Sequence, residues 1–142
     1  MTAIARRGVP LPTVVELMTT DPIVIPGELA AVDAARILEF YRVSGAPVVD
    51  EEGSIVGVIS ESDLVHAFTS APLLDAWPGL AVIDLMSRPA ITVGGGVLAD
   101  AAARLMEANH VHRLVVVASD GRTPIGILTR SDLLRALTGW ED

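Results

Sequence analysis

Two short stretches decide how this chain is organised: Gly57-Val-Ile-Ser-Glu-Ser-Asp-Leu-Val65 and Gly126-Ile-Leu-Thr-Arg-Ser-Asp-Leu-Leu134. Each contains a glycine, two apolar residues, a hydroxyl residue, a charged residue and Ser-Asp-Leu, in the same order. They lie in different halves of a chain of 142 residues. Either the chemistry of a helix start has recurred by chance, or one binding site is present twice.

The similarity extends well beyond these stretches, and it shows that the chain is two copies of one unit. Val15-Glu-Leu-Met-Thr-Thr-Asp-Pro22 corresponds to Ile83-Asp-Leu-Met-Ser-Arg-Pro89, and Ala35-Arg-Ile-Leu-Glu39 corresponds to Ala103-Arg-Leu-Met-Glu107. Duplication explains these matches better than coincidence does. The sequence therefore predicts an N-terminal arm, copy one, a linker, copy two and a short tail, at residues 1–13, 14–70, 71–82, 83–138 and 139–142.

Each copy has the pattern of a strand, a helix, two strands and a second helix. In copy one, the apolar run Ile23–Ile25 ends at a Pro-Gly turn pair. Ala46–Val49 and Ser54–Ile59 are predicted strands joined by the turn Asp50–Gly53. We therefore expect a mixed fold, α/β (α+β), made of two tandem β-α-β-β-α units packed about a pseudo-twofold axis. The cleft between two such units is a natural place for a ligand.

The first helix of each copy follows from apolar residues at helical spacing, and in copy one it is predicted from Leu29 to Tyr41. The residues expected on its apolar stripe, with alanines filling in, are Leu29, Val32, Ile37 and Phe40 in copy one, and Val97, Ala101, Leu105 and Ala108 in copy two. The second helices are predicted to begin near Ser62 and Ser131.

Composition excludes several classes of function. The chain has no cysteine and no lysine, which excludes disulfides, thiol catalysis, Schiff-base chemistry and a P-loop lysine. A net charge of −8 argues against general affinity for nucleic acid. The sequence also lacks a run of about 18 to 20 apolar residues for a membrane span and the pattern of a signal peptide. We therefore expect a cytoplasmic protein without membrane contacts, and its 51% hydrophobic residues suggest surface buried against a partner.

The repeated motifs resemble the CBS motif. Copy one carries the resemblance in Met18–Pro22, in Arg42-Val-Ser-Gly-Ala-Pro-Val-Val-Asp50 and in Gly57–Leu64. Copy two carries it in Asn109-His-Val-His-Arg-Leu-Val-Val-Val117 and Gly126–Leu133. Together they cover nearly the whole chain and look like a stand-alone CBS pair, also called a Bateman module. The resemblance implies a regulatory, non-catalytic protein that forms homodimers, requires no cofactor and binds an adenosyl ligand: AMP, ADP, ATP or S-adenosylmethionine.

The resemblance also implies roles for particular residues. Asp63 and Asp132 would hold the ribose, and hydroxyl residues beside them would reach phosphate or ribose: Ser60, Ser62, Thr129 and Ser131. Four apolar residues would sandwich the purine: Ile23, Val43, Ile91 and Val111. His112 and Arg113 would contact phosphates, and Ser44 occupies the matching position in copy one.

The same spacing has a purely structural interpretation. Ser60-x-x-Asp63 and Thr129-x-x-Asp132 fit the capping box that starts a helix. A helix N-terminus also attracts phosphate, and a carboxylate accepts hydrogen bonds from ribose hydroxyls, so capping and binding are compatible. Because Glu61 would repel phosphate where copy two has Arg130, the cleft at Asp132 is the expected nucleotide site.

Other interpretations receive less support from the sequence. Arg113 could pair with a carboxylate of this acidic chain rather than with phosphate. His110-x-His112 has no third metal ligand nearby, and Gly94-Gly-Gly96 lacks the spacing of a phosphate-binding loop. Ser and His residues are present, but no G-x-S-x-G elbow accompanies them. We therefore expect neither a metal site nor an enzyme.

The main alternative to a sensor is a dimerisation or partner-docking scaffold that binds no nucleotide. The last helix offers Leu133, Leu134 and Leu137 on one face, followed by Trp140, and copy one has a similar apolar face. These faces either close the core of each unit or associate with a second copy or with an unidentified protein partner.

Overall fold

The computed structural model describes residues 11–70 and 79–139, which form two compact units. The copy-one unit contains the described part of Ile23–Ala90. The copy-two unit contains the described parts of Met1–Pro22 and Ile91–Asp142. Most of the predicted N-terminal arm and linker, together with Trp140, lie outside the described residues.

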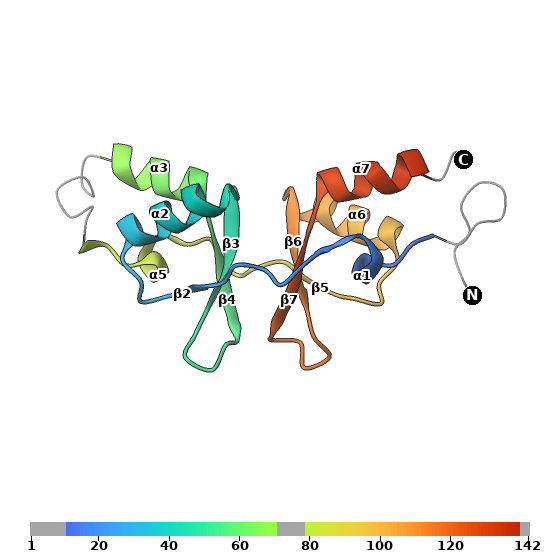
Figure 1. Cartoon of the computed structure of the whole chain (residues 1–142), viewed down its shortest axis with the longest axis horizontal. Helices are drawn as coiled ribbons and strands as arrows, with labels where there is room; N and C mark the ends of the chain where they lie inside the picture. The colour runs from blue at the N-terminus through green and yellow to red at the C-terminus, as the bar shows by residue number, and fades with distance from the viewer. Residues whose placement is uncertain (1–10, 71–78, 140–142) are drawn as a thin grey trace. The chain divides into compact units, whose positions relative to one another are not determined.

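The copy-one unit is a three-stranded sheet with helices packed against it (Figure 1). Its elements are β2 (Ile25–Pro26), α2 (Ala31–Tyr41), β3 (Gly45–Val49), β4 (Ile55–Ser60), α3 (Glu61–Thr69) and α5 (Val82–Leu85). The strand order is β2-β3-β4, with β2 parallel to β3 and β3 antiparallel to β4. Gly53, at a φ of 82°, lies in the tight turn between β3 and β4, as predicted.

The copy-two unit repeats this design and adds one strand. Its elements are α1 (Val14–Leu17), β1 (Thr19–Thr20), β5 (Thr92–Gly94), α6 (Ala99–Asn109), β6 (Arg113–Val117), β7 (Pro124–Thr129) and α7 (Arg130–Gly139). The strand order is β1-β7-β6-β5, and β5 is parallel to β6. The mixed α/β fold and the β-α-β-β-α order are thus confirmed in both copies.

A short segment from each copy packs in the unit of the other copy. Residues 12–19 include the start of copy one, which begins at residue 14, yet they lie in the copy-two unit, where the N–H of Val14 donates to the carbonyl of Val97 over 2.8 Å. Residues 80–87 do the reverse, and the N–H of Val82 donates to the carbonyl of Leu29 over 2.9 Å. We call residues 12–19 and 80–87 the exchanged segments. In Figure 1, α5 lies beside α2 in the copy-one unit, and α1 packs against α7 and β7 in the copy-two unit.

The glycine in each repeated stretch makes room for an exchanged segment. A Cβ atom at Gly57 would lie 2.6 Å from Sδ of Met86 and 2.8 Å from the carbonyl oxygen of Ser87. A Cβ at Gly126 would meet Met18 in the same way. Because ordinary carbon contacts are about 3.5–4.0 Å, any side chain here would displace the segment.

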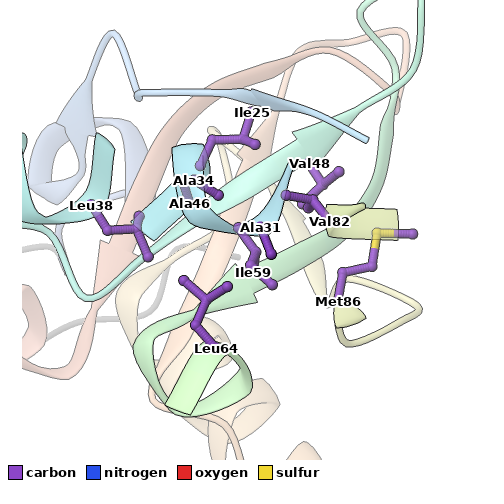
Figure 2. Close-up of a cluster of buried hydrophobic side chains, with 10 residues drawn as sticks. All are labelled: Ile25, Ala31, Ala34, Leu38, Ala46, Val48, Ile59, Leu64, Val82 and Met86. Atoms are coloured by element: carbon purple, nitrogen blue, oxygen red, sulfur yellow. The ribbon is translucent and has the colours of Figure 1, made fainter. Parts of the chain in front are cut away.

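Each unit has its own hydrophobic core. Figure 2 shows the core of the copy-one unit, which is built from Ile25, Ala31, Ala34, Leu38, Ala46, Val48, Ile59, Leu64, Val82 and Met86. The equivalent cluster in the copy-two unit is Val14, Val93, Ala102, Met106, Leu114, Val116 and Leu128. Both cores include residues of an exchanged segment, so each unit needs its segment to bury its apolar surface.

Only part of the predicted apolar stripe of the first helix faces the core. The buried residues are Ala31, Ala34 and Leu38 in α2 and Ala99, Ala102 and Met106 in α6. Phe40 is 78% exposed, and Ala101 and Ala108 are exposed as well. Small alanine side chains allow the helix to lie close to the sheet, and one large residue of each helix, Leu38 or Met106, is buried with them. Ile37 is only partly buried.

The first strand of copy one is also shorter than predicted. β2 is Ile25–Pro26, and Ile23 lies outside it. In copy two the N–H of Val115 donates to the carbonyl of Ile91 over 3.1 Å and extends the parallel pairing. Copy one has Pro47 at the position of Val115, and proline has no N–H to donate. The proline therefore accounts for the shorter strand.

Candidate functional site

The repeated stretch of copy one forms a polar site where β4 ends and α3 begins. The N–H of Asp63 donates to Oγ of Ser60 over 3.1 Å, and the N–H of Ser60 donates to Oδ2 of Asp63 over 2.9 Å. The second carboxylate oxygen, Oδ1, accepts a hydrogen bond of 3.2 Å from the hydroxyl of Ser87. We call Ser60, Asp63 and Ser87 the Asp63 rim.

Copy two forms the same arrangement between β7 and α7. The N–H of Thr129 donates to Oδ2 of Asp132 over 2.8 Å, and the N–H of Asp132 donates to Oγ1 of Thr129 over 3.3 Å. Oδ1 of Asp132 accepts from Nη2 of Arg135 over 2.6 Å. We call Thr129, Asp132 and Arg135 the Asp132 rim. The capping box expected from the spacing is present in both copies, with both of its reciprocal hydrogen bonds.

The two rims differ in how accessible their carboxylates are. Asp132 is only 3% exposed and is held by a guanidinium, whereas Asp63 is partly buried and is held by a neutral hydroxyl. The position that corresponds to Arg135 is His66, which is exposed. A ligand hydroxyl that approaches Asp132 therefore competes with an ion pair, and one that approaches Asp63 competes with a weaker bond.

The charge beside each rim also differs. α3 begins with Glu61, and α7 begins with Arg130, both exposed. Nη1 of Arg130 donates to Nδ1 of His112 over 3.0 Å, which fixes Nδ1 as the acceptor. Arg113 opens β6 and pairs with Thr129 in the sheet register. Positive charge therefore gathers at the Asp132 rim and negative charge at the Asp63 rim.

Four of the predicted residues line grooves between helices. Val43 and Ser44 line a groove of about 630 Å³ between α2 and α3. Val111 and His112 line the equivalent groove of about 670 Å³ between α6 and α7. We call these the α2–α3 groove and the α6–α7 groove. Neither Asp63 nor Asp132 is among the residues that line these grooves.

The remaining predicted residues are two serines at the helix starts and two isoleucines outside the rims. Ser62 and Ser131 are exposed at the second position of α3 and α7. Ile91 packs against the core of the copy-two unit, and Ile23 is partly buried just before β2. Their roles toward a ligand stay predictions.

Sequence reasoning did not identify two residues that hold the carboxylates. Ser87 reaches Asp63 from an exchanged segment, and nothing in the local sequence indicates that contact. Arg135 follows Asp132 by one helical turn, a spacing at which opposite charges commonly pair. That spacing was the available signal for Arg135.

The described residues show no sign of other common sites. Across residues 11–70 and 79–139, no group of three or more His, Cys, Asp or Glu side chains could hold a metal ion. Within the same ranges, no helix combines the length and the apolar character needed to cross a membrane.

Comparison with known proteins identifies the family. The sequence model of the CBS domain matches residues 14–70 and 82–139. An uncharacterized protein of Methanocaldococcus jannaschii, MJ1426, is 32% identical over 82% of this chain and 86% of its own length. Inosine-5'-monophosphate dehydrogenase of Mycobacterium leprae is 30% identical over 83% of this chain, but the match spans only 21% of that enzyme.

Solved structures agree with this assignment. CBSX2, which is from Arabidopsis thaliana, in complex with AMP has a TM-score of 0.80 and 32% identity, over 92% of this chain and 99% of that one. The CBS domain pair of MJ0100 in complex with 5'-methylthioadenosine and S-adenosylmethionine has a TM-score of 0.79 and 28% identity. The match covers 92% of this chain and 98% of that one. The CBS domain of a bacterial CNNM/CorC family Mg²⁺ transporter in complex with ATP has a TM-score of 0.76 and 25% identity, and the match covers 90% of this chain and 88% of that one. This chain, with two matching repeats of one α/β unit, belongs to the CBS domain family.

Proposed function

We propose that this chain is a regulatory module that binds an adenosyl compound at its repeated rims. The ligand class is AMP, ADP, ATP or S-adenosylmethionine. Three similar structures are complexes with AMP, with 5'-methylthioadenosine and S-adenosylmethionine, and with ATP. The match to inosine-5'-monophosphate dehydrogenase spans about a fifth of that enzyme, so it supports a regulatory role and no catalytic one.

The observation that carries the proposal is the pairing of a carboxylate with a hydroxyl at a helix start, in both copies. At the Asp63 rim, the carboxylate can accept hydrogen bonds from both hydroxyls of a ribose. The hydroxyls of Ser60 and Ser62 lie at the N-terminus of α3, where the helix dipole favours phosphate. At the Asp132 rim, Thr129 and Ser131 hold the same positions at α7.

The apolar and cationic candidates complete each site in the proposal. The purine would lie against Ile23 and Val43 at the Asp63 rim, and against Ile91 and Val111 at the Asp132 rim. Ser44 would assist at the first rim, and His112 and Arg113 would contact phosphate at the second. Arg–phosphate pairing is strong because the planar guanidinium donates two parallel hydrogen bonds.

The charges beside the rims suggest that the two sites prefer different ligands. Arg130 and His112 lie near the Asp132 rim, which suits the phosphates of AMP, ADP or ATP. Glu61 lies beside the Asp63 rim, which suits the positively charged sulfonium of S-adenosylmethionine. We therefore propose nucleotides at Asp132 and a cationic adenosyl compound at Asp63.

Ligand binding would be read out by another protein or by a second copy of the chain. A ligand changes such a contact only if it binds the two states with different affinity. Because adenine nucleotides and S-adenosylmethionine are intracellular metabolites, we propose that the protein acts in the cytoplasm.

Thermal unfolding with a ligand panel tests the proposal. The ligands are AMP, ADP, ATP, NAD and S-adenosylmethionine, and the variants are Asp63→Ala and Asp132→Ala. A ligand at about 100 times its Kd adds about 2.7 kcal/mol of stability, which corresponds to about 5–10 °C for a chain of this size. We expect Asp132→Ala to abolish the shift with nucleotides and Asp63→Ala to abolish the shift with S-adenosylmethionine.

Asp33→Ala is the matched control, because Asp33 also lies in a first helical turn and pairs with Arg36 over 2.9 Å. It should lower the midpoint slightly and leave every ligand shift intact. If no ligand moves the midpoint of the unmodified chain, the rims are helix caps alone and the protein is better described as a docking scaffold.

A further inference from the structure

One partner of the Asp63 carboxylate comes from outside copy one. Ser87 belongs to copy two by sequence and ends the exchanged segment 80–87, and its hydroxyl donates to Oδ1 of Asp63 over 3.2 Å. Its backbone pairs with β4, where Ser87 and Val58 each donate an N–H to the carbonyl of the other, over 2.9 and 3.0 Å. Ser87 is exposed, so a ligand that reaches Oδ1 of Asp63 also reaches the serine hydroxyl.

The rest of the same exchanged segment is anchored in the copy-one unit. Val82 and Met86 are buried in the core of that unit (Figure 2). The N–H of Val82 donates to the carbonyl of Leu29, and the N–H of Ile83 donates to the carbonyl of Gly27, both over 2.9 Å. The segment therefore runs from the residues just before α2 to the Asp63 rim, and a contact at Ser87 stabilises one end of it.

The equivalent position in copy two is arranged differently. Thr19 corresponds to Ser87 in the other exchanged segment, and it pairs with Ile127 in the register of β1 and β7. Oδ1 of Asp132, however, accepts from Nη2 of Arg135, which lies on α7 itself. Within residues 11–70 and 79–139, no hydrogen bond joins Asp132 to the hydroxyl of Thr19. In this part of the chain, the carboxylate linked by a side chain to an exchanged segment is thus Asp63.

We propose, on the basis of the proposed function, that Ser87 is a ligand-binding residue of the Asp63 rim and that the bound ligand fastens the exchanged segment 80–87 to α3. A ribose hydroxyl that donates to Oδ1 of Asp63 places its own oxygen about 2.7 Å from that atom. It replaces the hydroxyl of Ser87 there. Because a serine hydroxyl rotates to suit its partners, Ser87 can then donate to the ribose oxygen. The ligand thereby bridges the start of α3 and the end of the exchanged segment.

Hydrogen exchange of the full chain, followed by mass spectrometry, tests this bridge with S-adenosylmethionine as the ligand. Peptides that cover residues 80–87 report release of the segment, because several of its N–H groups bond carbonyls elsewhere in the unit. We expect saturating ligand to slow their exchange about two- to tenfold, the effect of one added hydrogen bond. Peptides of the other exchanged segment, residues 12–19, should exchange at an unchanged rate.

Variants of Ser87 separate a ligand contact from a purely structural role. In an Asp132→Ala background, we expect Ser87→Ala to weaken the affinity for S-adenosylmethionine about two- to tenfold, as measured by isothermal titration. The same variant should lose the slowing of exchange by the ligand. Ser87→Thr supplies the hydroxyl that copy two has at Thr19, and it should restore both properties. Thr19→Val is the matched control on the other exchanged segment and should change neither.

The outcomes distinguish this bridge from the binding function itself. If S-adenosylmethionine raises the unfolding midpoint but slows exchange of residues 80–87 equally with and without the Ser87 hydroxyl, or not at all, the bridge is overturned and the binding function stands. Unchanged affinity in Ser87→Ala would also overturn the bridge. If S-adenosylmethionine neither raises the midpoint of the unmodified chain nor binds in titration, its proposed binding at the Asp63 rim fails and the bridge fails with it.

Discussion

Arg135 and Asp132 form an ion pair of 2.6 Å between Nη2 and Oδ1, whereas in copy one the equivalent carboxylate oxygen, Oδ1 of Asp63, accepts a hydrogen bond from the hydroxyl of Ser87. The carboxylate at which we propose a nucleotide is therefore the one that already has a cationic partner. Access to the Asp132 rim depends on releasing Arg135, and that dependence can be measured.

Replacing Arg135 by the residue of copy one should strengthen ligand binding at the Asp132 rim. Arg135→His removes a competitor for the carboxylate, and an ion pair with an exposed arginine contributes up to about 1 kcal/mol, so we expect a gain of about two- to fivefold in adenosine affinity. Isothermal titration in an Asp63→Ala background measures it. Arg36→His, at the equivalent ion pair of α2, is the control. A loss of AMP affinity with unchanged adenosine affinity would show instead that Arg135 binds phosphate.

The two capping boxes should contribute unequally to stability. Asp63→Ala removes a partly buried cap, and we expect it to cost about 1 kcal/mol. Asp132→Ala also removes a charge-assisted bond from a buried position, so it should cost about 1 kcal/mol more. Urea unfolding without ligand measures both values. Equal losses would mean that the buried position of Asp132 and its partner Arg135 add nothing to the fold.

Substituting either glycine of the repeated stretches should destabilise its unit. Gly57→Ala places a methyl group 2.6 Å from the sulfur of Met86 and 2.8 Å from a backbone oxygen, so we expect a loss of about 1–3 kcal/mol. Gly126→Ala should behave alike. Gly94→Ala is the control, because its Cβ would meet nothing within 4 Å. Urea unfolding measures the free energy of unfolding of the three variants. Similar values for all three would show that the exchanged segments do not pack closely against Gly57 and Gly126.

One acidic residue of the second hairpin should titrate unusually low. The hydroxyl of Thr123, followed by the N–H groups of Arg122 and Thr123, lowers the pKa of Asp120 to about 2. A depressed pKa in the folded chain stabilises the fold above the ordinary value of 3.8, and this contribution disappears as the pH falls through about 2.

We expect Thr123→Val to raise the pKa of Asp120 toward 3.8, as followed by NMR titration, with Ser119→Ala as the control. An unchanged pKa would show that the backbone N–H groups suffice.

Much of the fold could be predicted because the chain repeats itself. Because the sequence is duplicated, a weak pattern in one copy could be checked against the other copy. This comparison predicted the turns, the hairpins and the order of the elements. The apolar stripe was wrong in part because helical spacing included Phe40, which is exposed, whereas the fully buried residues of this helix include Ala31 and Ala34. At a helix that lies close to a sheet, small side chains are the ones that fit.

The candidate site was predictable only where its chemistry is local. Ser60 and Asp63 are close in sequence, so their spacing predicted their contact. Ser87 reaches the same carboxylate from a distant segment, and no local pattern reveals such a partner. Val43 and Val111 were assigned to a purine site by resemblance. They line the helical grooves, and their contact with a purine stays a prediction.

The exchanged segments have a consequence for how such a chain could have arisen. A gene that encoded a single copy would make a product whose sheet lacks an exchanged segment to cover it. The product's own exchanged segment would have no sheet of its own to pack against. Such a product would complete its fold by exchanging these segments with a second molecule. Tandem duplication would convert this exchange between two molecules into an exchange within one chain. On this argument, the single-copy ancestor would have been an obligate dimer before its two halves became covalently joined.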